Sequence, residues 1–375
     1  MATSIDTAAD DWAVVPVSSD PVFWEVFVRA VNSPSWRLVT PPGVADNAGL
    51  VAAAGGVSSL TVAVRPSQDL LFSPLAATAD GGSRWSAAGP ISAGVAASPG
   101  GLAAFGGKLA ALLGNGAIEA SANAGATWST LAKPDTIAAS PAGKGCGGAV
   151  QVTTISFGPT GTDVLAGGTC GTVGTTAVFS YSTGAGWQRV SLPVSGQLVR
   201  LTDEMALVLG KSGLRALWRE MPAANEAVPP ANAAQPAAAG WSASAALPVS
   251  GPVIASGALA GSRVPAGSEA VAGAGPQDGS GAWVLLPGGR AAMISAPAPP
   301  TPAGHAPAAT RVLPRWVLLP PLPAHTTVLA SGPGGATDAL AVSGATLTVW
   351  QLAPGATRWA KAQTIVVPIQ YGSSS

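Results

Sequence analysis

Charged residues are scarce in this chain. Its 375 residues include 18 Lys and Arg and 18 Asp and Glu, so that 10% of the chain is charged and the formal net charge is zero. Globular domains usually contain about 25% charged residues. A nucleic-acid-binding protein needs a basic face, and a polybasic membrane anchor needs a run of Lys or Arg. The sequence has neither feature, so we expect no nucleic-acid partner and no charge-driven membrane binding.

Cysteine is nearly absent. Cys146 and Cys170 are the two cysteines, and no histidine lies near them, which excludes an ordinary structural zinc site. We favour a Cys146–Cys170 disulfide and therefore an extracytoplasmic or cell-surface location, with two reduced cysteines in the cytoplasm as the alternative. The first 20 residues lack the basic and apolar segments of a secretory signal, so export would require a leader that this sequence does not contain.

Long apolar runs are also missing. Stretches such as 85–107 are interrupted by Gly and Pro, which predicts no transmembrane segment. What the chain has instead is 48 Gly and 34 Pro. This composition is typical of many short strands joined by turns, and it favours an all-β fold.

Three eight-residue segments share one pattern. Thr78–Trp85 reads TADGGSRW, and Ser121–Trp128 reads SANAGATW. Ser180–Trp187, a weaker copy, reads SYSTGAGW. An Asp or Asn side chain can accept hydrogen bonds from the backbone of its own turn, and glycine adopts positive φ freely. We expect the turn residues to be structural: Asp80, Gly82, Trp85, Asn123, Gly125, Trp128, Ser182, Gly184 and Trp187.

The pattern S/T-x-D/N-x-G-x-S/T-W resembles the Asp-box, or BNR repeat, of the sialidase-like β-propellers. The resemblance implies blades of four antiparallel strands. Tryptophans that begin a strand ending in Pro recur at intervals of 49, 43, 59, 54, 75 and 43 residues, from Trp36 to Trp359. Such periods are typical of propeller blades. We predict a single propeller of seven blades, with six or eight as alternatives.

The clearest repeat predicts four strands: Ile91–Pro99, Lys108–Leu113, Ala117–Ala120 and Trp128–Leu131. The first repeat offers three strands, within 12–40. Either Thr364–Ile369 completes that blade, or the blade remains incomplete. We expect a flexible tail at 1–11, the propeller at 12–370, and a second tail at 371–375. Ala/Pro-rich inserts at about 221–240 and 295–310 are expected to be mobile loops where a box turn would otherwise lie.

Catalytic constellations are hard to find. A sialidase resembling this family would need a Tyr–Glu nucleophile, and neither Tyr181 nor Tyr371 suits that role. Asp203-Glu204 is expected to be a solvated loop pair, because neighbours in a strand point to opposite faces. Asp10-Asp11 is expected to be solvated as part of the N-terminal tail. We expect no metal and no cofactor, and the enzyme question is left open with a preference for a non-enzyme.

In propellers of the resembled family, ligands bind on the face opposite the box turns. The resemblance places nine polar residues around that face: Asp46, Asn47, Arg65, Asp69, Asn115, Asp135, Lys211, Arg290 and His325. The preferred function is a non-enzymatic extracytoplasmic recognition or scaffold propeller that binds a protein or a glycan. One alternative is a glycan-active hydrolase or lyase that draws two carboxylates from Asp46, Asp69 and Asp135. The other is an assembly factor similar to the photosystem-assembly propellers.

Overall fold

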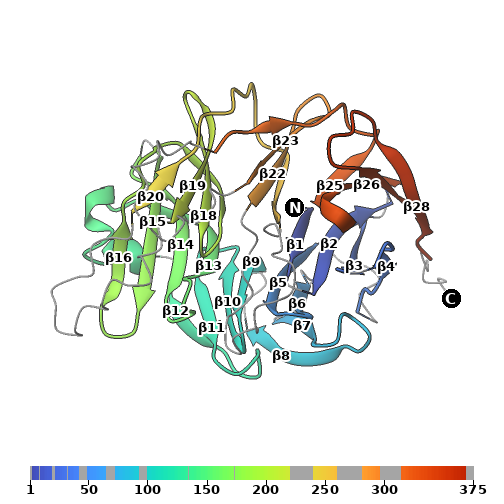
Figure 1. Cartoon of the computed structure of the whole chain (residues 1–375). Helices are drawn as coiled ribbons and strands as arrows, with labels where there is room; N and C mark the ends of the chain where they lie inside the picture. Colours follow the sequence, from blue (N-terminus) through green and yellow to red (C-terminus); the bar gives the residue numbers. More distant parts are fainter. Residues whose placement is uncertain are drawn as a thin grey trace, which may run out of the picture.

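The computed structural model of the chain describes residues 2–7, 9–18, 22–31, 33–41, 49–64, 72–92, 99–133, 135–172, 174–219, 240–259, 281–295 and 314–368. These residues form seven antiparallel sheets of four strands, arranged as a propeller (Figure 1). Within each sheet, hydrogen-bonded neighbours follow the order of the chain. The prediction of an all-β propeller with seven four-stranded blades is confirmed.

The blades are contiguous in sequence, and their first strands line the centre of the ring. The first three comprise β1–β4 (Thr3–Asp6, Asp10–Val17, Phe23–Ala30, Arg37–Leu38), β5–β8 (Leu50–Gly56, Ser59–Val64, Phe72–Thr78, Ser86–Ser92) and β9–β12 (Pro99–Phe105, Lys108–Leu113, Ile118–Ser121, Ser129–Ala132). The fourth comprises β13–β16 (Val150–Phe157, Val164–Cys170, Thr175–Ser182, Gly186–Val190).

The last three blades follow the same plan. They comprise β17–β20 (Gln197–Leu201, Met205–Gly210, Gly213–Arg219, Trp241–Ala243), β21–β24 (Ala255–Leu259, Gly281–Leu286, Arg290–Ser295, Val317–Leu318) and β25–β28 (Thr326–Ser331, Thr337–Ser343, Thr346–Leu352, Ala360–Val366). Helix is limited to three short turns in the described residues: α1 (Thr136–Ala139), η2 (Lys144–Cys146) and η3 (Pro333–Gly335). No helix among these residues is long and apolar enough to cross a membrane.

The N-terminal segment is not a tail. Strand β1 lies at the centre of the ring (Figure 1) and pairs with β2 in the register Thr3↔Val14 to Asp6↔Asp11. Thr7 closes the connecting turn, because its Oγ1 accepts a hydrogen bond from the Asp10 backbone N–H at 3.0 Å. The expectation of a flexible tail at 1–11 is therefore wrong, and the first blade is complete without the C-terminal segment. Strand β28 pairs with β27 instead.

One inner strand was also misplaced. The run Ile91–Pro99 was expected to be the first strand of the third blade, but β9 begins at Pro99 and pairs with β10 across the turn Gly106-Gly107. Two consecutive glycines are a strong hairpin signal, and they fix this register. Ile91 belongs to β8 of the preceding blade and is fully buried. The predicted second strand, Lys108–Leu113, is confirmed.

Apolar clusters fill the interfaces between blades. Each cluster draws residues from neighbouring sheets, as where Ile155 and Phe157 of β13 meet Leu112 of β10. Alternating inward and outward side chains along each strand supply these faces. The two Ala/Pro-rich inserts fall mainly outside the described residues, and each lies between the third and fourth strands of its blade, after β19 and β23.

Candidate functional site

Two faces of the propeller must be distinguished. Antiparallel strands place the connections between first and second strands and between third and fourth strands on one side, which we call the box face. The connections between second and third strands, and those that join successive blades, lie on the other side, which we call the loop face. The box turns lie on the box face because they join β7 to β8 and β11 to β12.

The box turn of the third blade is held by two side chains. Asn123 Oδ1 accepts hydrogen bonds from the Thr127 N–H at 2.9 Å and from the Ser121 hydroxyl at 3.0 Å. Ser121 Oγ in turn accepts a hydrogen bond from the Gly125 N–H at 2.9 Å. Gly125 has φ +86°, which an L-residue would adopt only with strain. The side chains therefore bind their own backbone rather than a ligand.

The second blade repeats this geometry. Asp80 Oδ1 accepts hydrogen bonds from the Arg84 N–H and the Thr78 hydroxyl, both at 2.9 Å. Mainly because of the Arg84 N–H bond, the pKa of Asp80 is lowered. Gly82 has φ +78°, and a Cβ there would lie 2.7 Å from the Val39 side chain. The turn is thus packed against the first blade.

The third box-like turn is built differently. Strand β15 ends at Ser182 and β16 begins at Gly186, so the turn is a short hairpin rather than the longer box. No hydrogen bond joins the Ser182 side chain to the described backbone of this turn, although Gly184 retains a positive φ of 104°. The ring of Trp187 lies 5.3 Å from that of Tyr181. This turn therefore lacks the side-chain acceptor that the sequence led us to expect.

The box tryptophans connect successive blades. Trp85 Nε1 donates to the Val39 carbonyl at 2.7 Å, and Trp128 Nε1 donates to the Gly89 carbonyl at 3.1 Å. Trp359 makes the same kind of bond to Pro320 at 3.5 Å. Each acceptor lies in or beside the outer strand of the preceding blade. In contrast, Trp187 Nε1 is buried and has no hydrogen-bond partner in the described part of the chain.

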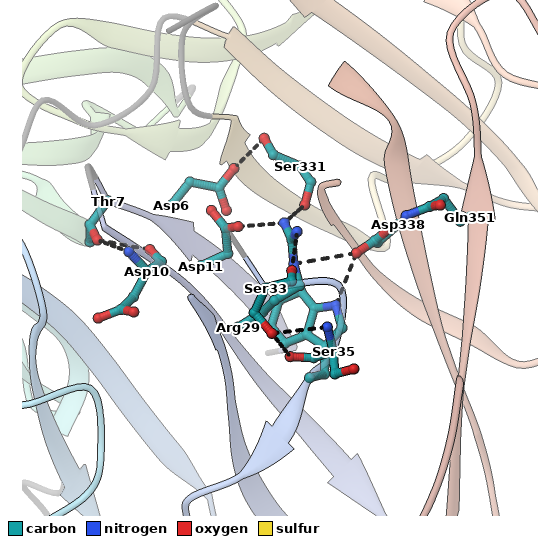
Figure 2. Close-up of polar contacts among 11 residues, drawn as sticks. Asp6, Thr7, Asp10, Asp11, Arg29, Ser33, Ser35, Ser331, Asp338 and Gln351 are labelled. Carbon is teal, nitrogen blue, oxygen red and sulfur yellow. Dashed lines mark hydrogen bonds and ion pairs between the residues drawn. The ribbon is translucent and has the colours of Figure 1, made fainter. Parts of the chain in front are cut away.

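A buried charged network lies where the first and seventh blades meet (Figure 2). Arg29 of β3 is 2% exposed, forms an ion pair with Asp11 of β2, and donates to the carbonyl of Ser331 in β25. Its Nε lies 3.5 Å from Oδ2 of Asp338 in β26. The guanidinium therefore links two strands of the first blade to two strands of the seventh.

Trp36 strengthens the same junction. Its Nε1 donates to Asp338 Oδ2 at 2.9 Å, while its backbone N–H and carbonyl bind the side-chain amide of Gln363 in β28, each at 2.8 Å. Gln351 Nε2 donates to Asp338 Oδ1 at 3.1 Å. We call this set of contacts the ring-closing seam; it comprises Asp11, Arg29, Trp36, Ser331, Asp338, Gln351 and Gln363. The seam joins the two ends of the ring without a shared strand.

The seam is unsuited to catalysis. Burial raises the pKa of Asp338, although the hydrogen bond from Trp36 and the charge of Arg29 oppose that rise. Asp11 and Asp338 are only 2% and 1% exposed, so a substrate has no access to them. Asp10 is 6% exposed and points away from the Arg29 guanidinium (Figure 2). The expectation that Asp10-Asp11 is a solvated pair is therefore wrong. Asp203, 9% exposed, also departs from the solvated loop pair that was expected.

Five of the nine expected ligand residues lie in the described part of the chain, and their positions in the sequence of strands put all five on the loop face. Asn115 and Lys211 lie between second and third strands, and Arg290 begins a third strand. Asp135 and His325 lie between successive blades. Asn115 Oδ1 accepts a hydrogen bond from the Ala117 N–H of its own turn at 3.0 Å. The other four fall outside the described residues: Asp46, Asn47, Arg65 and Asp69.

A cleft of about 310 Å³ opens on the loop face between the third and fourth blades. Asp135 and Ala138 form one wall, and the segment Gly148–Gln151 forms another. Thr169 and Gly171, at the end of β14 and just beyond it, complete the lining. Asp135 is thus the one expected ligand residue that lines this cleft.

The disulfide lies beside the cleft. Cys146 and Cys170 are joined, as the sequence favoured, and both are buried. Cys170 lies between the two cleft residues of β14 and its turn, while Cys146 ends η2 just before Gly148. The bond therefore ties the connection that contains α1 and η2 to the sheet of the fourth blade.

A β-bulge shapes the same wall. Thr153 is the extra residue of β13, since Val152 pairs with Gly168 and Thr154 with Gly167. A Cβ at Gly168 would lie 1.9 Å from the Gln151 carbonyl oxygen, so the position requires glycine. Gln151 and Thr153 are exposed along this bulged end of the strand. Bulges commonly redirect side chains near binding sites.

Sequence reasoning missed the seam. Asp11, Arg29 and Asp338 carry no local motif, and the partners Trp36 and Asp338 are 302 residues apart. One sequence signal for the strand β1 was present. Thr7 and Thr202 each accept a hydrogen bond from the backbone N–H three residues on, and each closes the turn between the first and second strands of its blade. Comparing these turns would have identified a strand before Thr7. Among the described residues, no group of three or more His, Cys, Asp or Glu is arranged to hold a metal ion.

No protein-family model matches the chain, and no curated protein matches it in sequence. Solved structures do share its fold. A candidate 6-phosphogluconolactonase from Bacteroides fragilis superposes with a TM-score of 0.54 at 10% identity, covering 96% of each chain. YCF48 from Cyanidioschyzon merolae superposes with a TM-score of 0.51 at 14% identity, covering 93% of this chain and 94% of its own. At these identities the likeness shows the fold alone.

Proposed function

We propose that this chain is a non-enzymatic recognition propeller that binds a protein or a glycan through its loop face. The observation that carries the proposal is the cleft beside Asp135, which is fixed in place by the Cys146–Cys170 disulfide. A fixed, solvent-open cleft can bind a partner without first ordering a loop, which lowers the entropic cost of association. The disulfide also favours an extracytoplasmic location.

The box geometry supports a related proposal, that the second and third blades carry true Asp-boxes. In both blades, a carboxylate or amide oxygen accepts a backbone N–H four residues on, and the following tryptophan bonds the preceding blade. These contacts use the polar groups of the box turns within the fold itself. Recognition is therefore assigned to the opposite face.

The rival proposal, a glycan-active hydrolase, needs two carboxylates about 5 to 10 Å apart in one pocket. Asp135 is the single acidic residue that lines the described cleft. The cleft alone therefore does not contain a carboxylate pair. Asp46 and Asp69, the other acids of that hypothesis, lie outside the described residues.

Binding and catalysis can be separated in one experiment. The purified protein would be screened against glycan and peptide arrays, beside a Cys146→Ser/Cys170→Ser variant and a Glu119→Gln variant, whose acidic residue does not line the cleft, as a control. We expect saturable binding that the double serine variant loses and the control retains. Binding that is unaffected by loss of the disulfide would contradict the assignment to this cleft. Release of a new reducing end from any bound glycan would establish the hydrolase instead.

A further inference from the structure

The charge of the loop-face cleft indicates what it can bind. Asp135 is the only charged residue among those that line it, and Gln151 and Thr169, which face each other as cross-strand partners, are neutral. The remaining lining residues are small or apolar. The cleft therefore presents one negative charge against a polar but uncharged background.

The Asp135 carboxylate is not used by the fold. Asp135 occupies the position before α1, where aspartate usually accepts a hydrogen bond from the helix, yet its side chain makes no such bond. Thr136 holds this turn instead, because its Oγ1 accepts the Lys133 N–H at 2.9 Å. Asp135 forms no salt bridge with any residue that the structure describes. An exposed carboxylate with no structural task is available to a ligand.

The apolar part of the lining suits a long flexible side chain. Ala138, Ala149 and Val150 supply methyl groups around the cleft, and Gly148 and Gly171 leave room for close approach. Lysine and arginine bury an aliphatic stem along such surfaces while the charged head remains at a polar rim. A carboxylate forms stronger hydrogen bonds with such a cationic donor than with a neutral one. No aromatic residue lines the cleft to support a sugar ring.

We infer that the cleft binds a basic side chain, lysine or arginine, presented by a protein partner, with Asp135 as the residue that binds the cation. This inference rests on the proposed loop-face recognition and narrows its ligand class from protein or glycan to a cationic group on a protein. The volume of about 310 Å³ is at the small end for ligand pockets, which fits one side chain rather than an extended ligand.

The test uses small probes of matched shape. Three probes would be titrated into the isotopically labelled full chain: Nα-acetyl-lysine methylamide, which keeps its charged Nε ammonium, its arginine analogue, and its neutral norleucine analogue. The backbone amide resonances of Gly148, Gln151 and Gly171 would be followed. We expect the two cationic probes to shift these resonances saturably and norleucine to leave them unchanged. Asp135→Asn should weaken binding roughly fivefold, as loss of an exposed ion pair does, while Glu119→Gln should bind as the unmodified chain does.

Two results would overturn the inference. One is equal binding of norleucine and lysine, and the other is unchanged lysine affinity in Asp135→Asn. If a neutral peptide or glycan from the array screen shifts the same amides equally in both proteins, the cationic ligand class is wrong while loop-face recognition stands. If array binding survives loss of the disulfide and no array ligand or probe shifts the cleft amides, the proposed function is wrong as well.

Discussion

The charged residues of the ring-closing seam are buried and paired, whereas the one charged residue of the loop-face cleft is exposed and unpaired by any described residue. In the seam, Asp11 and Asp338 are almost fully buried and share the Arg29 guanidinium, which thus pairs with one carboxylate from each end of the chain. In the cleft, Asp135 is exposed and unpaired by any described residue. A chain with so few charges places one group of them where the ring must close. The comparison indicates that buried charge here joins the two ends of the ring, whereas the exposed Asp135 carboxylate remains open to solvent.

The largest effect should come from removing the cation of the seam. Arg29→Met leaves Asp11 and Asp338 buried without their counter-charge, and breaking a buried ion pair in this way costs about 3 to 5 kcal/mol. Denaturant unfolding would measure the loss. Arg358→Met, at an exposed position of the seventh blade, is the matched control and should change stability by less than about 0.5 kcal/mol. Equal effects of the two substitutions would show that the seam does not hold the ring.

Breaking the disulfide should have the next largest effect. Cys146 and Cys170 are 24 residues apart, and a bond that closes such a loop stabilises the fold by about 3 kcal/mol. The Cys146→Ser/Cys170→Ser variant should therefore unfold at lower denaturant concentration, and amide exchange should increase first around the cleft. A reducing agent should destabilise the unmodified chain but leave the variant unchanged. Faster amide exchange in the seam than at the cleft would contradict the assignment of the disulfide to the cleft's stability.

The box turns should come third. Ser121 is buried, donates to Asn123 and accepts the Gly125 N–H, so Ser121→Ala should cost about 1 to 2 kcal/mol. Ser182 takes the place of the acceptor Asn123 in the third box-like turn, but its side chain makes no hydrogen bond to the described backbone of that turn. Ser182→Ala should thus change the free energy of unfolding by less than about 0.5 kcal/mol. If both substitutions cost the same, the hydrogen bonds of the box turn contribute nothing measurable.

The smallest effect concerns pH. Because burial raises the pKa of Asp338 above its ordinary value of 3.8, the folded state favours the protonated carboxyl. The stability contribution of this group is therefore greatest at low pH and is lost as the pH rises from 3.8 through the raised pKa. Asp338→Asn should abolish that part of the pH dependence. Unfolding free energies of both proteins between pH 3.5 and pH 8 would test it, and parallel curves would refute it.

The fold was predictable because its signals are local. The octets ending at Trp85 and Trp128 contain the turn, its acceptor and its packing residue within eight positions, and these indicated the blades on either side. The short hairpin at Ser182 shows the limit, since a similar string of residues formed a tighter turn without the acceptor bond. Gly106-Gly107 was an equally local signal, and it would have corrected the start of β9.

The seam could not be predicted in the same way. Asp6 and Asp11 lie in an Ala/Ser-rich segment that is typical of a tail. Their role shows only in contacts with β25, where Asp6 accepts a hydrogen bond from the Ser331 hydroxyl at 2.7 Å and Arg29, the partner of Asp11, donates to the Ser331 carbonyl. Asp135 was identified from the loop pattern alone, and the cleft around it depends on how the disulfide holds two segments together. The cleft is lined by residues from separate segments, so no single stretch of sequence predicts its shape or its charge.

Because every blade is contiguous, the order of synthesis matches the order around the ring. Asp11 and Arg29 are made early, but Asp338 and Gln363 arrive only with the last blade. The charges of the first blade must therefore stay hydrated while the intervening blades form, and the long loop between the partners closes last. Closing such a loop is entropically costly and slow. The burial of these charges therefore depends on a complete ring, because the residues that cover them belong to the seventh blade.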